Sequence, residues 1–335
     1  MGIPLADLWL LIIAFLLVLA VVLDGFGLGV GLLALAAGPR RRALMMDSLE
    51  HVWVPNQTWL VVLGGMLFGA FPRFYGVVLT ALYLPLLLML FGLIARAVAF
   101  EFRAQAAEKA PWGRVFAAAS TAAAAGEGLA LGGLLGGLPV QGGRFVGGAW
   151  DWFSPLALLV AVGVGCGYVL LGAAFLVYKT AGDVQERAYR QARIASWLVL
   201  AAAAAVNALL AARYPHVAGK WSWGPQLAGV AVFPLLALVA FAALQWTLRE
   251  RRSEVAPFAA GAVLVLAVFA GGSAALYPYM IPPFDTVDMA AASPKTLRFM
   301  LVATVLLLPV MLAYNLYQVQ VFRGKVGASG GGYGS

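Results

Sequence analysis

Charged residues are scarce in this sequence. Asp, Glu, Lys and Arg together make up 11% of its 335 residues, whereas 63% of the residues are hydrophobic. A soluble domain has charged residues at about a quarter of its positions, because they cover the surface that faces water. The composition therefore excludes a soluble enzyme and indicates an integral membrane protein.

Cysteine and histidine, which ligate most transition metals, are nearly absent. The only cysteine, Cys166, lies within the apolar stretch 156–178, so we expect neither a disulfide nor a thiolate metal site and interpret it as a small buried side chain. The two histidines, His51 and His216, fall in predicted loops on opposite sides of the membrane, so they cannot both ligate one membrane-buried haem. We therefore expect no metal ligands here, and any redox cofactor should be held mainly by another chain.

Nine apolar segments come near the length of about 20 residues that a helix needs to cross a bilayer. The second is short and can be extended to include residues 53–57. The segments are 8–37, 58–72, 75–99, 112–136, 154–178, 194–212, 226–248, 257–277 and 297–322. We expect one transmembrane domain over residues 1–326 and a flexible, Gly/Ser-rich cytoplasmic tail over 327–335.

The basic residues predict the orientation of these segments. The net charge is +8, but the basic residues lie between apolar segments, which argues against nucleic-acid binding. The odd-numbered connections and the tail carry 15 of the 22 Lys and Arg residues, and the other connections carry six. Because cytoplasmic loops collect positive charge, we expect the amino terminus outside and the carboxyl terminus in the cytoplasm. A re-entrant second segment would destroy this alternation, so we count it as a span.

Ionisable residues within the apolar segments are the main functional candidates, because lipid makes them costly. Asp24, Arg96 and Glu127 lie inside segments, and Glu101 lies at the inner edge of the third. Asp24 and Arg96 are expected at similar depth, so one hypothesis is an ion pair that neutralises both. The alternative is a proton route from the cytoplasm through these carboxylates. Glu127, among small residues, is equally consistent with a proton relay and with a packed neutral acid.

Several motifs occur in the same order as in a known family. Residues 23–31 read LDGFGLGVG, close to LDGFDLGVG, and residues 52–60 read VWVPNQTWL, similar to VWDGNQVWL. FGAFP at 68–72 and RAVAFEFR at 96–103 are similar to FAAFP and RxVxFEFR. Further matches lie at 167–173, 179–182, 277–278, 281–283, 292–294 and 322–326. Across essentially its whole length, the sequence thus resembles subunit II of the cytochrome bd-type quinol oxidases.

The resemblance implies an all-α subunit of nine transmembrane helices, arranged as two four-helix bundles plus one peripheral helix. It implies a larger partner, subunit I, which oxidises quinol and passes electrons through two b haems to haem d, where dioxygen is reduced to water. Subunit II of this family supports assembly and helps to form proton and oxygen routes. The resemblance places the chain in the cytoplasmic (inner) membrane of a bacterium or archaeon, and allows a small single-helix accessory subunit. The apolar surface would accommodate a bound quinone or lipid.

Two positions depart from the family pattern. Val54 and Gly27 stand where VWDGNQVWL and LDGFDLGVG have acids, so the proton route of the family cannot simply be transferred. The route can run wholly through subunit I, which we favour; otherwise Glu127 replaces the lost acids, or Asp24 with Glu101 suffices. Three residues that match the family are candidates to line a channel, namely Asn56, Gln57 and Trp59.

The alternative from another functional class is a secondary transporter, in which the intramembrane Asp, Arg and Glu would form a substrate site near the midplane. A transporter of this kind should contain an internal repeat with paired broken segments. The sequence contains no clear repeat, so the oxidase subunit is the favoured interpretation.

Overall fold

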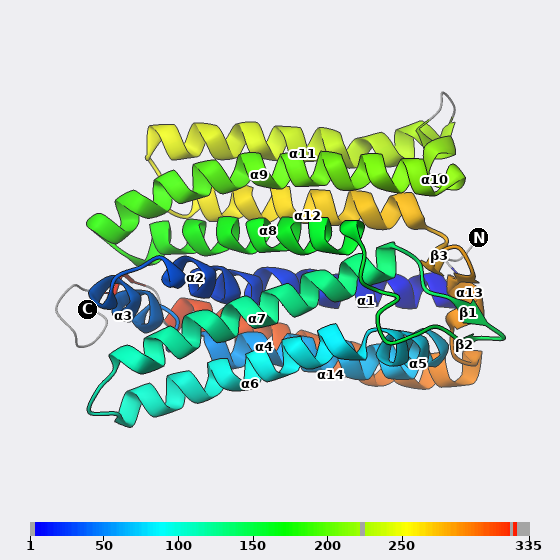
Figure 1. Ribbon diagram of the computed structural model, residues 1–335, viewed down its shortest axis with the longest axis horizontal. Helices are drawn as coiled ribbons and strands as arrows, with labels where there is room; N and C mark the ends of the chain where they lie inside the picture. Colours follow the sequence, from blue (N-terminus) through cyan, green and yellow to red (C-terminus); the bar gives the residue numbers. More distant parts are fainter. Residues whose placement is uncertain (1–3, 222–224, 322–323, 327–335) are drawn as a thin grey trace.

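Long α-helices run side by side along the long axis of the molecule (Figure 1). The structure is a computed structural model that describes residues 4–221, 225–321 and 324–326. Its longer helices are α1 (Leu5–Leu23), α2 (Gly25–Leu35), α4 (Trp53–Ala70), α6 (Tyr83–Gln105), α7 (Ala110–Leu135), α8 (Pro155–Lys179), α9 (Asp183–Arg213), α11 (Pro225–Glu250), α12 (Ala256–Leu276) and α14 (Pro294–Val321). The shorter helices are α3 (Pro39–Asp47), α5 (Pro72–Ala81), α10 (Pro215–Lys220) and α13 (Val287–Ala290). Two antiparallel hairpins pair β1 (Val140–Gln141) with β2 (Arg144–Phe145), and β3 (Tyr279–Ile281) with β4 (Asp285–Thr286).

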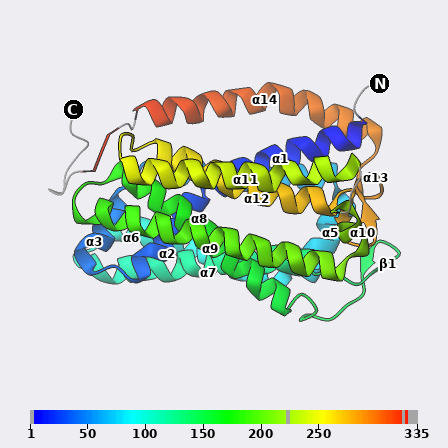
Figure 2. The same cartoon turned by 90° about the horizontal axis from the view of Figure 1, so that it is seen from above.

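The helices confirm the predicted all-α membrane protein. Within the described ranges, eight helices are long and apolar enough to cross a membrane, with α1 and α2 counted as one span over residues 5–35. The pair α4–α5, bent by 119°, is a ninth candidate. α4 runs along the long axis, whereas α5 lies at one end of the molecule (Figure 1). α1 begins at that end and α14 finishes at the other (Figures 1 and 2), which agrees with an odd number of crossings.

The third predicted span is wrong at its beginning. We expected it to cover residues 75–99, but residues 72–81 form α5, and the long helix α6 starts only at Tyr83. Two prolines are the cause, because proline lacks an amide hydrogen and favours the first turn of a new helix over the interior of an old one. Pro72 begins α5, and Pro85 lies in the first turn of α6. The proposed extension of the second span to Trp53 is confirmed, since α4 begins at that residue.

Two further boundaries differ from expectation or cannot be compared. α9 starts at Asp183 rather than at residue 194, because the polar stretch before the apolar segment is also helical. Hydropathy marks only the part of a helix that is apolar, so it misses such an extension. The predicted flexible tail, 327–335, and the end of the last predicted span, residue 322, lie outside the described residues.

The long helices form two groups that share an interface. α8, α9, α11 and α12 pack together, and α1–α2, α4, α6 and α7 form the second group. α2 and α7 both pack on α8 and so join the two groups, whereas α14 lies along one edge against α4 and α1 (Figure 2). The contact between α2 and α8 is very close, because a Cβ atom at Gly29 would overlap the Tyr168 carbonyl. Glycine at this position therefore lets the two backbones touch in a lipid environment.

The connections cluster at the two ends of the bundle. α5, α10, α13 and both hairpins lie at the end where α1 begins, and α3 lies at the opposite end (Figure 1). At the first end, the Arg73 guanidinium donates two hydrogen bonds of 2.7 Å to the buried Asp285 carboxylate, which ties α5 to β4. At the α3 end, the Val326 amide donates to the Lys179 carbonyl, 3.0 Å away, and fixes the segment after α14 to the end of α8.

Candidate functional site

Asp24 lies between α1 and α2, but it does not interrupt the helical hydrogen bonds. Its amide donates to the Ala20 carbonyl at 3.0 Å, and its own carbonyl accepts from the Leu28 amide at 2.9 Å. The first span therefore passes through Asp24 as a nearly continuous helix. This geometry directs the Asp24 side chain sideways toward α6, the helix that carries Arg96.

Asp24 and Arg96 form the ion pair that their predicted depths suggested. The Arg96 Nη1 donates to Asp24 Oδ1 at 2.7 Å, and the two side chains are 1% (Arg96) and 5% (Asp24) exposed. Gly27 explains how the guanidinium fits, because a Cβ atom at this position would overlap Arg96 Nη2. The glycine that replaces the family's second acid therefore provides the space that Arg96 occupies.

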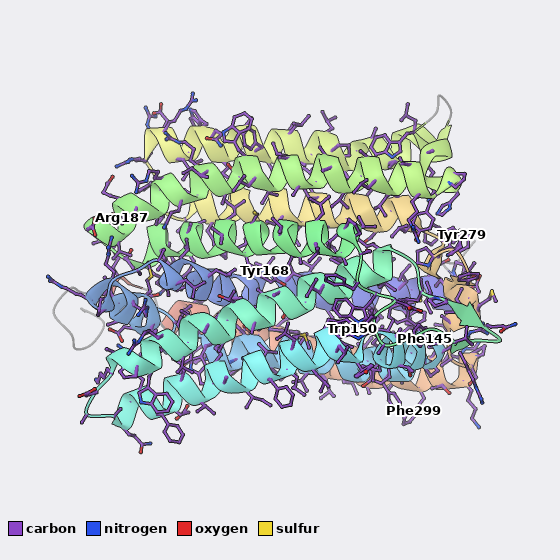
Figure 3. All side chains as sticks on the ribbon, viewed as in Figure 1. Phe145, Trp150, Tyr168, Arg187, Tyr279 and Phe299 are labelled. Atoms are coloured by element: carbon purple, nitrogen blue, oxygen red, sulfur yellow. The ribbon has the colours of Figure 1, made fainter. Side chains whose placement is uncertain are left out.

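A second polar pair joins α7 to α8. The Tyr168 hydroxyl donates to Glu127 Oε2 at a distance of 2.5 Å. Tyr168 is buried and lies near the middle of the long axis, where α8 faces α7 (Figure 3). Sequence reasoning had not singled out Tyr168 as a functional residue, because a single tyrosine in an apolar helix gives no indication of which acid it will meet.

The two pairs meet at a cavity of about 330 Å³ between the helix groups. Asp24, Glu127 and Tyr168 contribute to its wall, together with Asn207 and Ser273. The rest of the lining is predominantly apolar and comes from α1, α4, α6, α7, α8, α9 and α12. The structure therefore brings two of the predicted acids, Asp24 and Glu127, to the wall of one cavity.

Glu101 is not part of this cluster. It is exposed near the end of α6 and does not line the cavity. The structure therefore does not bring Asp24 and Glu101 to one site, and a route that relies on these two acids alone gains no support from the geometry.

The residues expected to line a channel have other contacts. The Asn56 side chain is buried and donates from Nδ2 to the Leu23 carbonyl at 2.7 Å, which holds α4 against the end of α1. The indole of Trp59 donates to Asn315 Oδ1 on α14 at 3.3 Å. Gln57 Nε2 is buried without a hydrogen-bond partner among the described residues. None of these three residues lines the cavity. Asn56 and Trp59 instead connect neighbouring helices through their hydrogen bonds.

Val54, at the other position where the family has an acid, faces outward. Its residue surface is 56% exposed, and it does not contribute to the cavity wall. An acid here would therefore lie on the outer surface of this chain, not beside Asp24 or Glu127. The replacement by valine removes a surface charge rather than a member of the internal cluster.

The histidines and the cysteine are not gathered at one place in the described structure. In the described residues, no group of three or more His, Cys, Asp or Glu side chains could hold a metal ion. His51 follows α3 and His216 belongs to α10, so they lie at opposite ends of the bundle (Figure 1). One haem cannot take both as axial ligands, so the residues present do not fit a haem held by a histidine pair.

Comparison with known proteins gives matches over almost the whole chain. A family model described as cytochrome bd terminal oxidase subunit II matches residues 5–322. Cytochrome bd-I ubiquinol oxidase subunit 2 of Escherichia coli is 26% identical, over 95% of this chain and 94% of that protein. Cytochrome bd ubiquinol oxidase subunit 2 of Bacillus subtilis is 27% identical, over 96% of both. The structure of bd oxidase from Geobacillus thermodenitrificans shares the fold, with a TM-score of 0.78, 19% identity, and coverage of 96% of this chain and 99% of that chain.

Proposed function

Since the chain belongs to the cytochrome bd terminal oxidase subunit II family, we propose that it is the haem-free subunit of a quinol oxidase in a bacterial or archaeal cytoplasmic membrane. Its main partner is a subunit I whose haems b and d carry electrons from quinol to dioxygen. The match over residues 5–322 carries this proposal, since it leaves almost no part of the described chain for another function. The secondary transporter is not favoured for the same reason.

A spectrum of the purified complex tests the partnership. The chain with a carboxyl-terminal tag should copurify, in mild detergent, with a larger subunit, and the reduced-minus-oxidised spectrum should show bands of b- and d-type haems. A lone, haem-free polypeptide under conditions that preserve related complexes would contradict it. A small accessory single-helix subunit would appear as a third band in the same preparation.

The assignment of the haems to subunit I has a separate test. The two histidines of this chain lie at opposite ends of the bundle, which supports ligation by the partner. We expect His51→Ala and His216→Ala to leave the ratio of haem to complex unchanged. A loss of one haem in either variant, with both subunits still present in equal amounts, would show that this chain supplies an axial ligand.

The proposed orientation puts the α3 end of the bundle in the cytoplasm. Arg40, Arg41 and Arg42 lie in α3, and Arg187, near the start of α9, lies at the same end (Figure 3). Positive charge at one end of a helix bundle favours the cytoplasmic side. A membrane-impermeant thiol reagent should therefore label a cysteine placed at Arg187 only after the cytoplasmic face is exposed, in a Cys166→Ala background.

The internal cluster supports a division of roles between its two pairs. The Asp24–Arg96 pair carries a charge of each sign in close contact, so it joins α6 to the first span without an excess charge. Glu127 has no cationic side chain in direct contact, and its hydrogen-bond partner is the neutral Tyr168 hydroxyl. Glu127 is therefore the acid of this chain best placed to bind and release a proton at the cavity, with Tyr168 orienting its carboxyl group. The main supply of protons for dioxygen reduction runs through subunit I.

Infrared difference spectroscopy of the complex tests the role of Glu127. If Glu127 changes protonation when the complex is reduced, the carbonyl band of its protonated carboxyl group should disappear in Glu127→Gln and shift in Tyr168→Phe. Oxygen consumption should fall only modestly in both variants, because the main route lies elsewhere. Identical difference spectra for wild type and Glu127→Gln would show that Glu127 has a structural role only. Normal haem content is the control for assembly.

A further inference from the structure

A second, smaller pocket lies at the α3 end of the molecule, away from the central cavity. It has a volume of about 110 Å³ and is formed by α3, the end of α6 and the start of α7. Three of its eight lining residues are cationic and none is acidic. The lining residues are Pro39, Arg42, Ala43, Met46, Arg103, Lys109, Ala110 and Gly113.

The cationic side chains are held in place by the surrounding helices. The Arg42 guanidinium donates to the carbonyls of Ala34 and Ala37 at 2.9 and 2.8 Å, which fixes it at the end of α2. Gly113 leaves room for the stem of Arg42, since a Cβ atom there would lie 2.9 Å from Arg42 Cδ. Carbonyl groups orient Arg42 without cancelling its charge.

The positive charge at the pocket is only partly compensated within the described chain. Arg103 donates from Nη1 to Asp47 Oδ1 at 2.8 Å, and the Arg103 side chain is 13% exposed. Lys109 is exposed and forms no ion pair among the residues described. One carboxylate in direct contact therefore faces three cations. Arg42 is half-buried and contacts carbonyl groups rather than a carboxylate, so an anion that enters the pocket is stabilised by the excess positive charge.

An aromatic pair beside the pocket indicates where this anion comes from. Phe102 and Trp112, which flank the pocket in sequence on α6 and α7, pack against each other with ring centroids 5.0 Å apart. Tryptophan is enriched at the level of the lipid headgroups, and basic pockets between helices on the cytoplasmic side bind anionic headgroups. A liquid-water molecule occupies about 30 Å³, so the pocket can accept a group of several heavy atoms such as a phosphate.

We infer that the pocket formed by Arg42, Arg103 and Lys109 binds the phosphate group of an anionic ligand, most favourably the phosphodiester of an anionic phospholipid in the cytoplasmic leaflet. The ligand neutralises the local charge and connects α3 to the ends of α6 and α7. This inference does not depend on the role of Glu127, but the lipid leaflet follows from the proposed orientation.

Lipid binding to the intact complex in nanodiscs tests the inference. Phosphatidylglycerol is titrated into phosphatidylcholine discs, and the lipid bound to each complex is counted by native mass spectrometry. Lys109→Gln should weaken binding about fivefold, the factor that corresponds to about 1 kcal/mol per basic residue near an anionic surface. Gly113→Ala, which keeps every charge but displaces Arg42, should also weaken it. Arg190→Gln, an exposed arginine on α9, is the matched control and should bind like wild type.

The outcomes distinguish the two sources of phosphate and the failure of the idea. Binding of phosphatidylglycerol that inorganic phosphate does not displace supports a lipid headgroup, whereas displacement by millimolar inorganic phosphate supports a soluble phosphate as the natural occupant. Equal binding in wild type, Lys109→Gln and Gly113→Ala would overturn the inference. An equal loss in Arg190→Gln would also overturn it, because the effect would then reflect the net charge of the surface. The haem spectrum of each variant shows separately whether the oxidase complex has assembled.

Discussion

The buried pair of Asp24 and Arg96 gives the sharpest prediction about stability. The bond between Arg96 Nη1 and Asp24 Oδ1 is 2.7 Å long, and the side chains are 1% and 5% exposed, so solvent screens their attraction little. Charges about 4 Å apart attract by about 4 kcal/mol at an effective dielectric constant of 20, and removal of one partner from a buried pair costs about 3–5 kcal/mol. Asp24→Asn should therefore destabilise the subunit by about 3–5 kcal/mol.

The two single substitutions should differ, because the charges left behind behave differently. Asp24→Asn leaves a guanidinium that cannot lose its proton, whereas Arg96→Met leaves a carboxylate that can bind one. We therefore expect Arg96→Met to be less destabilising than Asp24→Asn, and the double variant to be more stable than Asp24→Asn alone.

Unfolding of the complex in mixed micelles, followed by circular dichroism, provides the double-mutant cycle. The coupling energy between the two positions should exceed about 2 kcal/mol, in the upper part of the range of about 0.5–3 kcal/mol for residues in contact. Leu17→Ala, which changes an apolar residue of the cavity wall, is a control for the loss of packing alone. If both single variants and the double variant unfold within about 1 kcal/mol of wild type, the ion pair does not stabilise the fold and the reasoning fails.

Three other contacts give predictions of the same kind. Gly27→Ala should lower the free energy of unfolding by about 1–3 kcal/mol, because it displaces the Arg96 guanidinium. In the Arg96→Met background the same substitution should change this free energy very little. An equal decrease in both backgrounds would contradict this. Arg73→Met should cost about 2–3 kcal/mol in thermal unfolding, less than a fully buried pair because Arg73 is 35% exposed, and Arg73→Lys should lie between. The hydrogen bond from Lys325 lowers the pKa of Glu254, so this contact stabilises the fold above the ordinary carboxyl pKa and is lost as pH falls through the lowered one. The protection factors of the amides of residues 324–326, which compare exchange with the intrinsic rate at the same pH, should fall in acid and, at neutral pH, in Glu254→Gln but not in Arg252→Gln.

Hydropathy predicted the helices well, because the bilayer requires long apolar segments and leaves few alternatives. It failed at α5, where residues 72–81 are apolar but lie across the end of the bundle. The difference depends on the breaks at Phe71 and Leu82, and a window average over residue types does not detect a break. Pro72 and Pro85, in the first turns of α5 and α6, were the available signals.

The candidate site was predictable only where depth alone determines a contact. Asp24 and Arg96 were expected at the same depth in the membrane, and two opposite charges at the same depth in lipid attract each other and form a pair. The partner of Glu127 was not predictable, because Tyr168 reaches it only through the register of α7 against α8. Asn56 and Trp59 show the same limit, since their polar atoms bind a backbone carbonyl and α14 rather than a channel.

The two positions that depart from the family pattern have different physical consequences. Gly27 lies inside the bundle, and the space it leaves is occupied by the Arg96 guanidinium, so an acid there would compete with Asp24 for the same cation. Val54 lies on the outer surface, so an acid at this position would contact whatever covers that face and not the internal cluster. Among the acids of this chain predicted to lie within the membrane, Asp24 is paired with Arg96, and only Glu127 faces the cavity without a cation in direct contact. The proposed proton exchange inside this subunit therefore rests on Glu127 and its hydrogen bond to Tyr168. If the complex keeps its full activity without both side chains, the proposal would be left with all protons entering through subunit I.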